Sequence, residues 1–266
     1  MREQKRIFGV NLNRLSDFGF DIGSRFFADS LLESNFQKEM GDIVNILLDF
    51  RISVEELIRG GGGEASQTQR LSRGLEAHRW NKHIFSITKS VTLEDSLAQG
   101  GFKDKVFERV TESETHEIDH MKIVGDNILA LEIEWNNKPT FFARDLQAYG
   151  RLHDDGVIAA GIIITRGKAL QDNLRNIIMD FAKKNEITGI DSLRPWGYEP
   201  TNRQKAVIQS SMNRGMPFHE AWARLFTSDK YGSSTTHWET LMKALAQGGS
   251  KCPILSIGLP QEIITR

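Results

Sequence analysis

One stretch, residues 116–138, constrains this chain more than any other part of the sequence. It contains two runs rich in Ile, Val and Leu, separated by Gly125 and Asp126. A two-residue signal of this kind between alternating apolar runs is typical of a β-hairpin. If these two residues form the turn, Val124 faces Asn127, and that pairing sets the register of both strands. The stretch therefore predicts a hairpin of known register.

Three carboxylates fall on one face of this predicted hairpin. Asp119 lies directly opposite Glu132, where facing Cβ atoms are roughly 4.5–5.5 Å apart. Glu134 is two residues further on and shares that face, while Ile133 and Trp135 point the other way into a core. A turn longer by one residue would instead place Asp119 diagonal to both glutamates.

A patch of three carboxylates on a strand surface needs a physical reason. Like charges that oppose each other across strands repel, and their burial costs several kcal/mol. A divalent cation removes that conflict, and Mg²⁺ binds through one or two carboxylates together with water and phosphate oxygens. The pattern favours a metal site for phosphate-ester chemistry, and a solvated strand face with ordinary acidic residues is the alternative on spacing alone.

The composition is that of an ordinary globular chain. Of the 266 residues, 39% are hydrophobic and 26% are charged, which suits one large domain or two small ones with a sizeable core. No run approaches the roughly eighteen apolar residues of a membrane span, and no apolar segment with a cleavage site follows the charged N-terminus. We therefore expect neither a membrane segment nor secretion.

The cysteine count and the net charge narrow the function classes. A single Cys252 excludes an internal disulfide and fits a reducing cytoplasm, and its position beside Pro253 indicates a structural thiol. The net charge of −1 argues against binding to nucleic acid by bulk electrostatics alone. It is compatible with a sequence-specific binder that has a local basic cleft.

The order of predicted elements indicates an α/β fold with a central mixed β-sheet flanked by helices. After the hairpin, a helix over about 141–153 precedes a nearly all-apolar strand over 157–165 and an amphipathic helix over 168–184. Further elements are expected in the following ranges: helical signals over 25–50, a capping-box helix over 53–58, a helix over 64–78, an extended segment over 84–88, helices over 202–213 and 217–226, and a last buried strand over 253–259.

Two loops contain further candidate functional residues. Four glycines at 60–63 indicate a flexible loop or a close backbone approach to a ligand, but no phosphate loop, because no Gly-Lys-Ser/Thr follows. Glu64 follows them as a polar helix cap or as a further candidate active-site acid. The hydroxyl-rich run 233–237 suits contacts with base edges and phosphates, and equally an N-cap before Trp238.

Several segments resemble the type II restriction endonucleases of the BglII/BstYI group, within the PD-(D/E)xK nuclease superfamily. The resemblance is continuous over about 116–166 and patchy elsewhere. The segments that carry it are Ile118-Asp119-His120, Leu131 to Lys138, Arg144-Asp145-Leu146, Leu152-His153 and the strand end from Ile162 to Arg166; Gly60 to Glu64 and Ser233 to His237 are also similar.

The resemblance implies a restriction-endonuclease-like core with helical additions. It implies a homodimeric, Mg²⁺-dependent enzyme of the prokaryotic cytoplasm, paired with a cognate DNA methyltransferase. Such an enzyme cuts a short palindrome in double-stranded DNA and leaves 5′-phosphate and 3′-hydroxyl ends. We expect one endonuclease domain over 1–266, with a catalytic core at about 80–190 and 250–260, a helical part at 1–79, and a helical recognition insertion at about 194–247.

The matched motif also implies roles for the three carboxylates. By resemblance, Asp119 and Glu132 are metal ligands, and Glu134 stands where most of the superfamily has Lys. Ile118 stands in the place of the motif's Pro. Without that Lys, either Glu134 or a metal-bound hydroxide acts as the general base.

The DNA contacts and the dimer interface are the remaining expectations. Asn136 and Lys138 leave the catalytic strand toward the expected duplex, since Asn pairs well with adenine and Lys with guanine or phosphate. Helices within 25–58 or 202–226 are candidates for the dimer interface. A repair or junction-resolving nuclease and an inactive DNA-binding module remain alternatives. The second set of DNA-binding candidates is Ser233, Ser234, Thr235, Thr236 and His237.

Overall fold

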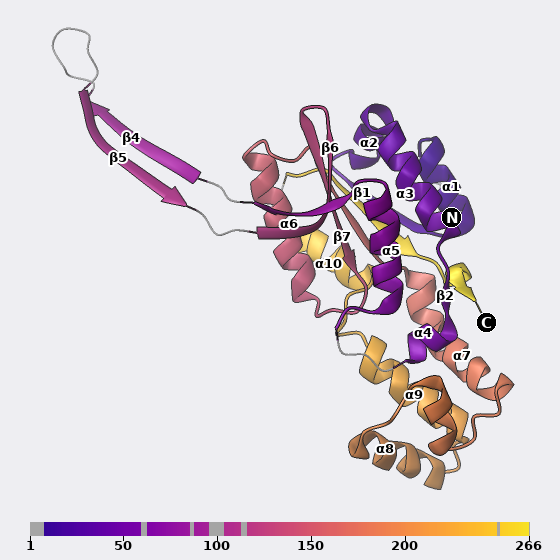
Figure 1. Cartoon of the computed structure of the whole chain (residues 1–266). Coiled ribbons are helices and arrows are strands. Elements are labelled where there is room, and N and C mark those ends of the chain that lie inside the picture. The colour runs from indigo at the N-terminus through magenta and orange to yellow at the C-terminus, as the bar shows by residue number, and fades with distance from the viewer. Residues whose placement is uncertain are drawn as a thin grey trace.

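A mixed six-stranded sheet organises the molecule (Figure 1). The structure is a computed structural model that describes residues 8–59, 63–85, 88–95, 104–112, 116–248 and 251–265. The three central strands, β7, β8 and β9, are parallel, while β1 pairs antiparallel with β9, β6 with β7, and β3 with β6. In spatial order the strands are β1 (Asp21–Arg25), β9 (Ile254–Leu259), β8 (Ala160–Arg166), β7 (Asn127–Glu134), β6 (His116–Val124) and β3 (Asn81–Phe85).

Helices cover both faces of this sheet, which confirms the predicted fold class. Helices α6 (Thr140–Asp154) and α10 (Trp238–Gln247) pack on one face. The other face is covered mainly by α1 (Val10–Phe18), α2 (Ala28–Asn35), α3 (Gln37–Asp49), α4 (Val54–Ile58), α5 (Ser66–Ala77) and α7 (Lys168–Lys184), together with the 3₁₀ turns η1 (Asp191–Trp196) and η2 (Gln261–Ile263). Helix α9 (Phe218–Tyr231) packs on α7 and carries α8 (Asn202–Asn213), and Figure 1 shows both beyond the sheet.

The apolar pattern of β8 explains its central place. All seven of its residues are buried, as expected for a strand with both faces covered. Ile162 and Ile164 belong to the core cluster on one face, whereas Ile163 belongs to the cluster on the other. This alternation fixes which side chains of the parallel neighbour β7 face α6, and that face carries the candidate carboxylates.

Several predicted boundaries hold and others change. The helix at 168–184 and the capping box at Ser53 are confirmed, but Phe36 divides the helical region 25–50 into α2 and α3. The helix expected over 217–226 continues to Tyr231. The part expected as helical at 1–79 also contributes strand β1, which covers the edge of the buried strand β9, and the short strand β2 (Ile52–Ser53), which pairs with β10 (Ile264–Thr265).

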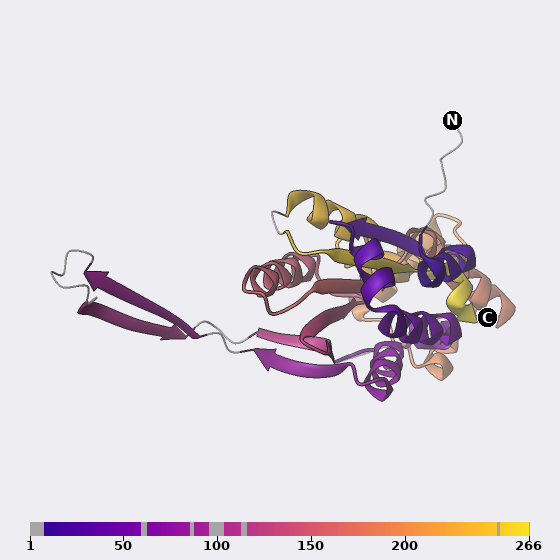
Figure 2. The same cartoon turned by 90° about the horizontal axis from the view of Figure 1, so that it is seen from above.

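A second hairpin was not predicted. Strands β4 (Thr88–Asp95) and β5 (Asp104–Glu112) pair only with each other, and Figures 1 and 2 show them projecting away from the sheet. Their polar, irregular sequences lack the apolar alternation of a half-buried strand. Two consecutive glycines at 100–101 are a turn signal in the sequence, and they lie outside the described residues. No helix in the described part of the chain is long and apolar enough to cross a membrane.

Candidate active site

The hairpin of β6 and β7 has the predicted register. Val124 pairs with Asn127, and the ladder continues to His120 opposite Leu131. Gly125 takes a left-handed backbone conformation with φ of 59°, as a two-residue turn of this kind requires. The two-residue turn is therefore confirmed over the alternative with one more residue.

A β-bulge in β6 modifies the position of Asp119. Where β3 has one residue, Lys82, between two paired positions, β6 has two, Asp119 and His120. Bulges re-aim side chains and are frequent beside active sites. Asp119 sits at the end of the regular ladder, with its side chain 51% exposed and its Oδ1 3.5 Å from the Lys82 Nζ. The β6–β7 pairing ends at His120 and Leu131, so Asp119 and Glu132 lie just beyond the last regular pair.

The two glutamates of β7 have the opposite environment. Glu132 is 2% exposed and Glu134 is 3% exposed, and both face α6. Asp145, fully buried on α6, acts electrostatically on both of them. Asp119 also raises the pKa of Glu132 as a neighbouring charge. The structure thus gathers the three predicted carboxylates and adds a fourth.

Burial dominates the protonation of this cluster. It raises the pKa of Glu132 to about 10, with the Asp145 and Asp119 charges as further causes. Burial raises the pKa of Glu134 to about 8, and the Asp145 charge adds to that effect. Without a compensating cation, Glu132 therefore keeps its proton at neutral pH. A cation at this place favours the ionised form.

The cluster has the chemistry of a site for a hard divalent cation, because all its donors are carboxylate oxygens. Within the described ranges, however, no three His, Cys, Asp or Glu side chains are already arranged as a complete metal-binding group. Asp119 is turned toward Lys82, whose Nζ also lies 2.6 Å from Glu117. The donor types fit a metal, and the half-exposed Asp119 carboxylate contacts both Lys82 and Glu132.

Arg144 is a cation that lies beside the buried acids. Its Nη2 lies 2.9 Å from the Asp145 Oδ1 and 3.8 Å from the Glu134 Oε1. The guanidinium stacks on Phe141, with its Cζ 4.4 Å from the ring centroid, and its side chain is half exposed. Arg144 thereby offsets part of the negative charge from the open side of the cluster.

Asp145, Lys82 and His120 were missed as site residues by the sequence analysis. Asp145 stood in a segment of the resemblance and off the apolar face of its helix, which was a usable signal. No signal in the sequence pointed to Lys82, because only the pairing of β3 with β6 brings it to Asp119. His120 is buried at 3% exposure beside Asp119, and burial lowers its pKa.

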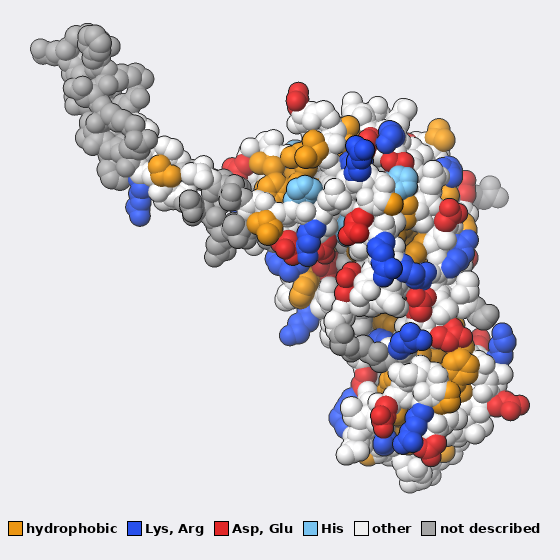
Figure 3. Space-filling view, viewed as in Figure 1, with side chains coloured by type: hydrophobic (Ala, Val, Ile, Leu, Met, Phe, Trp, Pro, Cys, Tyr) orange, Lys and Arg blue, Asp and Glu red, His pale blue; other side chains and the backbone are white. Residues whose placement is uncertain are grey.

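A cavity of about 680 Å³ opens beside Asp119. Glu64 and Glu76 belong to its wall, so the structure places the predicted additional acid, Glu64, in the same cavity as a predicted metal ligand. On the face shown in Figure 3, Lys and Arg side chains are interspersed with Asp and Glu rather than gathered in one basic area. This agrees with the low net charge of the chain.

The residues after β7 meet the loop before α10. Asn136 lines the cavity, and Lys138 is exposed. The backbone N–H of Asn137 donates to the Thr236 Oγ1 at 2.9 Å, and the Thr236 N–H donates to the Asn137 carbonyl at 2.8 Å. The two predicted DNA-contact segments are therefore joined at the end of β7.

The predicted recognition run divides into two parts. Ser233 and Ser234 are exposed, whereas Thr236 and His237 are buried. Thr235 is intermediate and accepts a hydrogen bond from Arg166 at 2.6 Å. Only the first part of the run is open to a ligand in this conformation.

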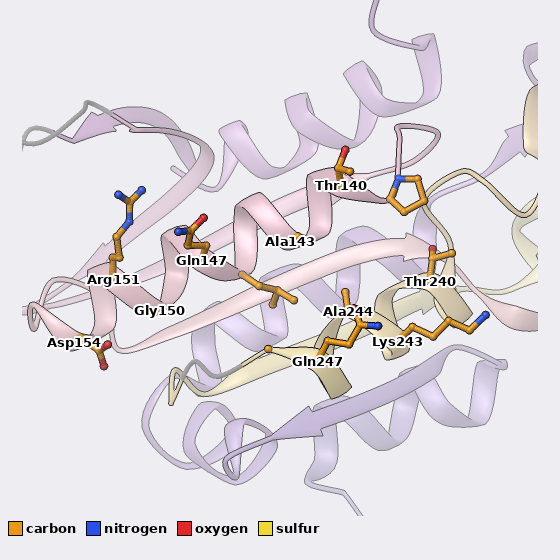
Figure 4. Close-up of a pocket in the computed structure, with 13 residues that line it drawn as sticks. Thr140, Ala143, Gln147, Gly150, Arg151, Asp154, Thr240, Lys243, Ala244 and Gln247 are labelled. Atoms are coloured by element: carbon orange, nitrogen blue, oxygen red, sulfur yellow. The ribbon is translucent and has the colours of Figure 1, made fainter.

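A second cavity, of about 690 Å³, lies between α6 and α10 (Figure 4). It contains small and apolar side chains, including Ala143, Leu146 and Ala244, with Lys243 and Arg151 at its margin. None of the clustered carboxylates lines it. It shares no lining residue with the cavity beside Asp119, and α6 lines only the second cavity.

The fold and this centre define a nuclease with a restriction-endonuclease-like core. Buried carboxylates on a central strand are linked through Asn137 to a polar loop, and Asp119 beside them lines an open cavity. The chain belongs to the BglII/BglIII restriction endonuclease family, whose model matches residues 20–259. It is a type II restriction endonuclease, and the match confirms the resemblance and extends it over most of the chain. No curated protein sequence matches this chain.

Proposed function

We propose that this endonuclease hydrolyses double-stranded DNA at a short palindrome, with Mg²⁺ as its cofactor, and leaves 5′-phosphate and 3′-hydroxyl ends. The observation that carries the proposal is the cluster of Glu132, Glu134 and Asp145, buried beside Asp119 at the β6 bulge. Members of this family are typically metal-dependent, and the cluster supplies the oxygen donors that Mg²⁺ prefers.

Asp119 and Glu132 are the residues that we propose as metal ligands. Glu132 is buried, whereas the half-exposed Asp119 contacts Lys82 at the surface and Glu132 on the next strand. When bound, the ion acts as a Lewis acid toward the phosphate and lowers the pKa of a coordinated water. Asp145 remains close enough to strengthen the negative field of the site.

Glu134 orients and deprotonates the attacking water in this proposal. The water oxygen forms a bond to phosphorus while the bond from phosphorus to the 3′ oxygen breaks. The water proton passes to a Glu134 oxygen, and the departing 3′ oxygen takes a proton from solvent water to become the 3′-hydroxyl. Its pKa, raised to about 8, makes the ionised carboxylate a stronger base than an ordinary glutamate. Arg144, 3.8 Å from Glu134, stabilises the ionised form before the proton arrives.

The segments around the end of β7 are the proposed DNA contacts. Asn136 and Lys138 are positioned for base edges or phosphates, and Ser233 and Ser234 offer exposed hydroxyls nearby. Thr235, Thr236 and His237, also proposed for DNA recognition, contribute from behind this surface because of their burial.

A palindromic site calls for a two-fold dimer, and we propose the cavity between α6 and α10 as the surface that a second copy covers. Small and apolar side chains line it together with polar and charged ones such as Gln147, Arg151 and Lys243, and α6, which carries Asp145, forms one wall. Pairing across α6 brings two catalytic centres close together, as cleavage of both strands within a short site requires. An Ala143→Arg variant should run as a monomer in analytical ultracentrifugation and lose double-strand cleavage, whereas a dimer of unchanged stability would contradict this interface.

The proposed setting is the prokaryotic cytoplasm, with a cognate DNA methyltransferase that protects the host's own sites. The direct test of the function is digestion of a DNA of known sequence with Mg²⁺, followed by mapping of the fragment ends. Cuts at one palindrome support the proposal. Random nicking or a preference for branched DNA points to a repair or junction-resolving nuclease, and inactivity with every divalent metal points to a binding module.

A further inference from the structure

We propose that Arg166 is a positioning residue that holds the 235–237 loop against the end of the catalytic strand, so that the loop's response to DNA sets the position of Glu134. This inference rests on the proposed function. It goes beyond that function because it assigns a specificity role to a fully buried residue that does not touch the DNA. In this role Arg166 affects the ratio of cleavage at correct and incorrect sites.

Arg166 ends β8 and is completely buried. Its Nε donates to the Trp135 carbonyl at 2.9 Å, and its Nη1 donates to the Gln171 Oε1 at 2.6 Å. Its Nη2 donates to the Thr235 Oγ1 at 2.6 Å and to the Thr236 carbonyl at 2.8 Å. One guanidinium thus joins the end of β7, helix α7 and the loop before α10.

A buried cation is costly unless it is paired, and here the partners are neutral oxygens. No carboxylate of the described residues forms an ion pair with Arg166, and its charge contacts the faces of Trp135 and Tyr231 instead. An apolar side chain of similar length would fill this space at lower cost. The guanidinium differs from an apolar side chain because its planar, rigid set of N–H donors holds several oxygen acceptors in defined positions.

The loop is linked to Glu134 through Asn137. Thr236 and Asn137 exchange two hydrogen bonds through the Thr236 hydroxyl and the two backbones. The Asn137 Nδ2 then donates to the Glu134 Oε2 at 2.7 Å. From the neighbouring strand the Thr165 hydroxyl donates to the Glu134 carbonyl, also at 2.7 Å. A displacement of the loop therefore moves the residue that orients the Glu134 carboxylate.

Ser233 and Ser234 give this link access to DNA, because they are exposed on the same loop. Contacts with a correct site hold the loop in place, and contacts with a wrong site displace it. Since displacements of about 1 Å at a reacting group can cost about a hundred-fold in rate, a modest movement is sufficient to separate correct from incorrect sites.

The test compares Arg166→Met with the wild-type protein on a duplex that carries the mapped cleavage site. We expect kcat to fall about a hundred-fold, while KM and the Kd measured in Ca²⁺ stay near wild type. We also expect the ratio of cleavage between the correct duplex and duplexes with one changed base pair to fall about tenfold. A residue that only stabilises the fold would lower the melting temperature without changing that ratio.

Matched variants complete the experiment. Arg175→Met removes an exposed arginine of α7 that pairs with Glu220, and it should leave kcat and the ratio unchanged. If Arg166→Met does not fold, the pair Thr236→Val and Thr236→Ser decides: Val should show the same changes to a smaller extent, and Ser should restore them. If the ratio of cleavage between correct and altered duplexes is unchanged, or if the variant loses only DNA binding, the role proposed for Arg166 is wrong. The proposed function then still stands. A wild-type protein that cuts no DNA overturns the proposed function as well.

Discussion

The two strands of the central hairpin carry carboxylates in contrasting environments. On β7, Glu132 and Glu134 are buried, and burial raises the pKa of both. On β6, Asp119 is half exposed and ion-paired with Lys82. We propose that the metal site combines a rigid half, the buried glutamates, with an adaptable half, the half-exposed Asp119. In this proposal a cation offsets the charge that burial disfavours, and Asp119 completes the coordination on binding.

The largest effect is expected from Glu132→Gln, which removes a ligand from the rigid half. Cleavage should fall roughly a thousand-fold, because a metal's Lewis-acid contribution is several kcal/mol and each 1.4 kcal/mol is about tenfold in rate. The metal-free variant should also melt at a higher temperature than wild type at pH 8, since it lacks the buried acid. Melting curves and timed digests measure both. Glu199→Gln, at an exposed glutamate, is the control.

Asp119→Asn tests the adaptable half. We expect a loss of cleavage of about a hundred-fold, with a free energy of unfolding within about 0.5 kcal/mol of wild type, as for other surface substitutions. The exposed Asp126 in the hairpin turn supplies the matched control Asp126→Asn. If Asp119→Asn changed stability as strongly as Glu132→Gln, the contrast between the two strands would be wrong.

The pH dependence of the metal-free protein sharpens the same comparison. Glu132 and Glu134 have folded-state pKa values of about 10 and 8, above their ordinary value of 4.5. The folded state therefore binds more protons than the unfolded state between these values, so stability is fully present below about pH 4.5 and is lost as the pH rises toward 10.

Metal binding should reverse this trend and release protons, because the ligands must ionise. Calorimetric titration of Mg²⁺ into the protein in buffers of different ionisation enthalpy measures the number released. We expect proton release near pH 7 from wild type and a smaller value from Glu132→Gln. Equal release from both proteins would show that Glu132 does not ionise on binding.

The smallest effect is expected from Lys82→Gln. This change frees Asp119 from its ion pair at the surface, where such pairs contribute only about 0–1 kcal/mol. We expect a melting temperature near that of wild type and a change of a few-fold in the Mg²⁺ concentration needed for half-maximal cleavage. Lys168→Gln, at another exposed ion pair, is the control. If Lys82→Gln instead lost as much cleavage activity as Asp119→Asn, Lys82 would be a residue that contacts the scissile phosphate.

Local pattern was sufficient for much of the fold. The turn at Gly125 and Asp126 fixes the hairpin register, and the periodicity of apolar residues predicted α6 and α7 to within a few residues. Strand β1 and the β4–β5 hairpin were not predicted from the sequence, because their residues lack a clear apolar alternation. For β1, only the need of the buried strand β9 for a partner explains its place.

The sequence by itself determined the register of the central hairpin and, with it, the gathering of Glu132 and Glu134 on one face, since both follow from a two-residue turn and the alternation of a strand. Only the tertiary structure decided the rest of the centre. It added Asp145 through the packing of α6, turned Asp119 outward at the bulge opposite Lys82, and joined the 235–237 loop to the strand through Arg166. These partners are distant in sequence, and only the order of strands and the faces covered by helices bring them together.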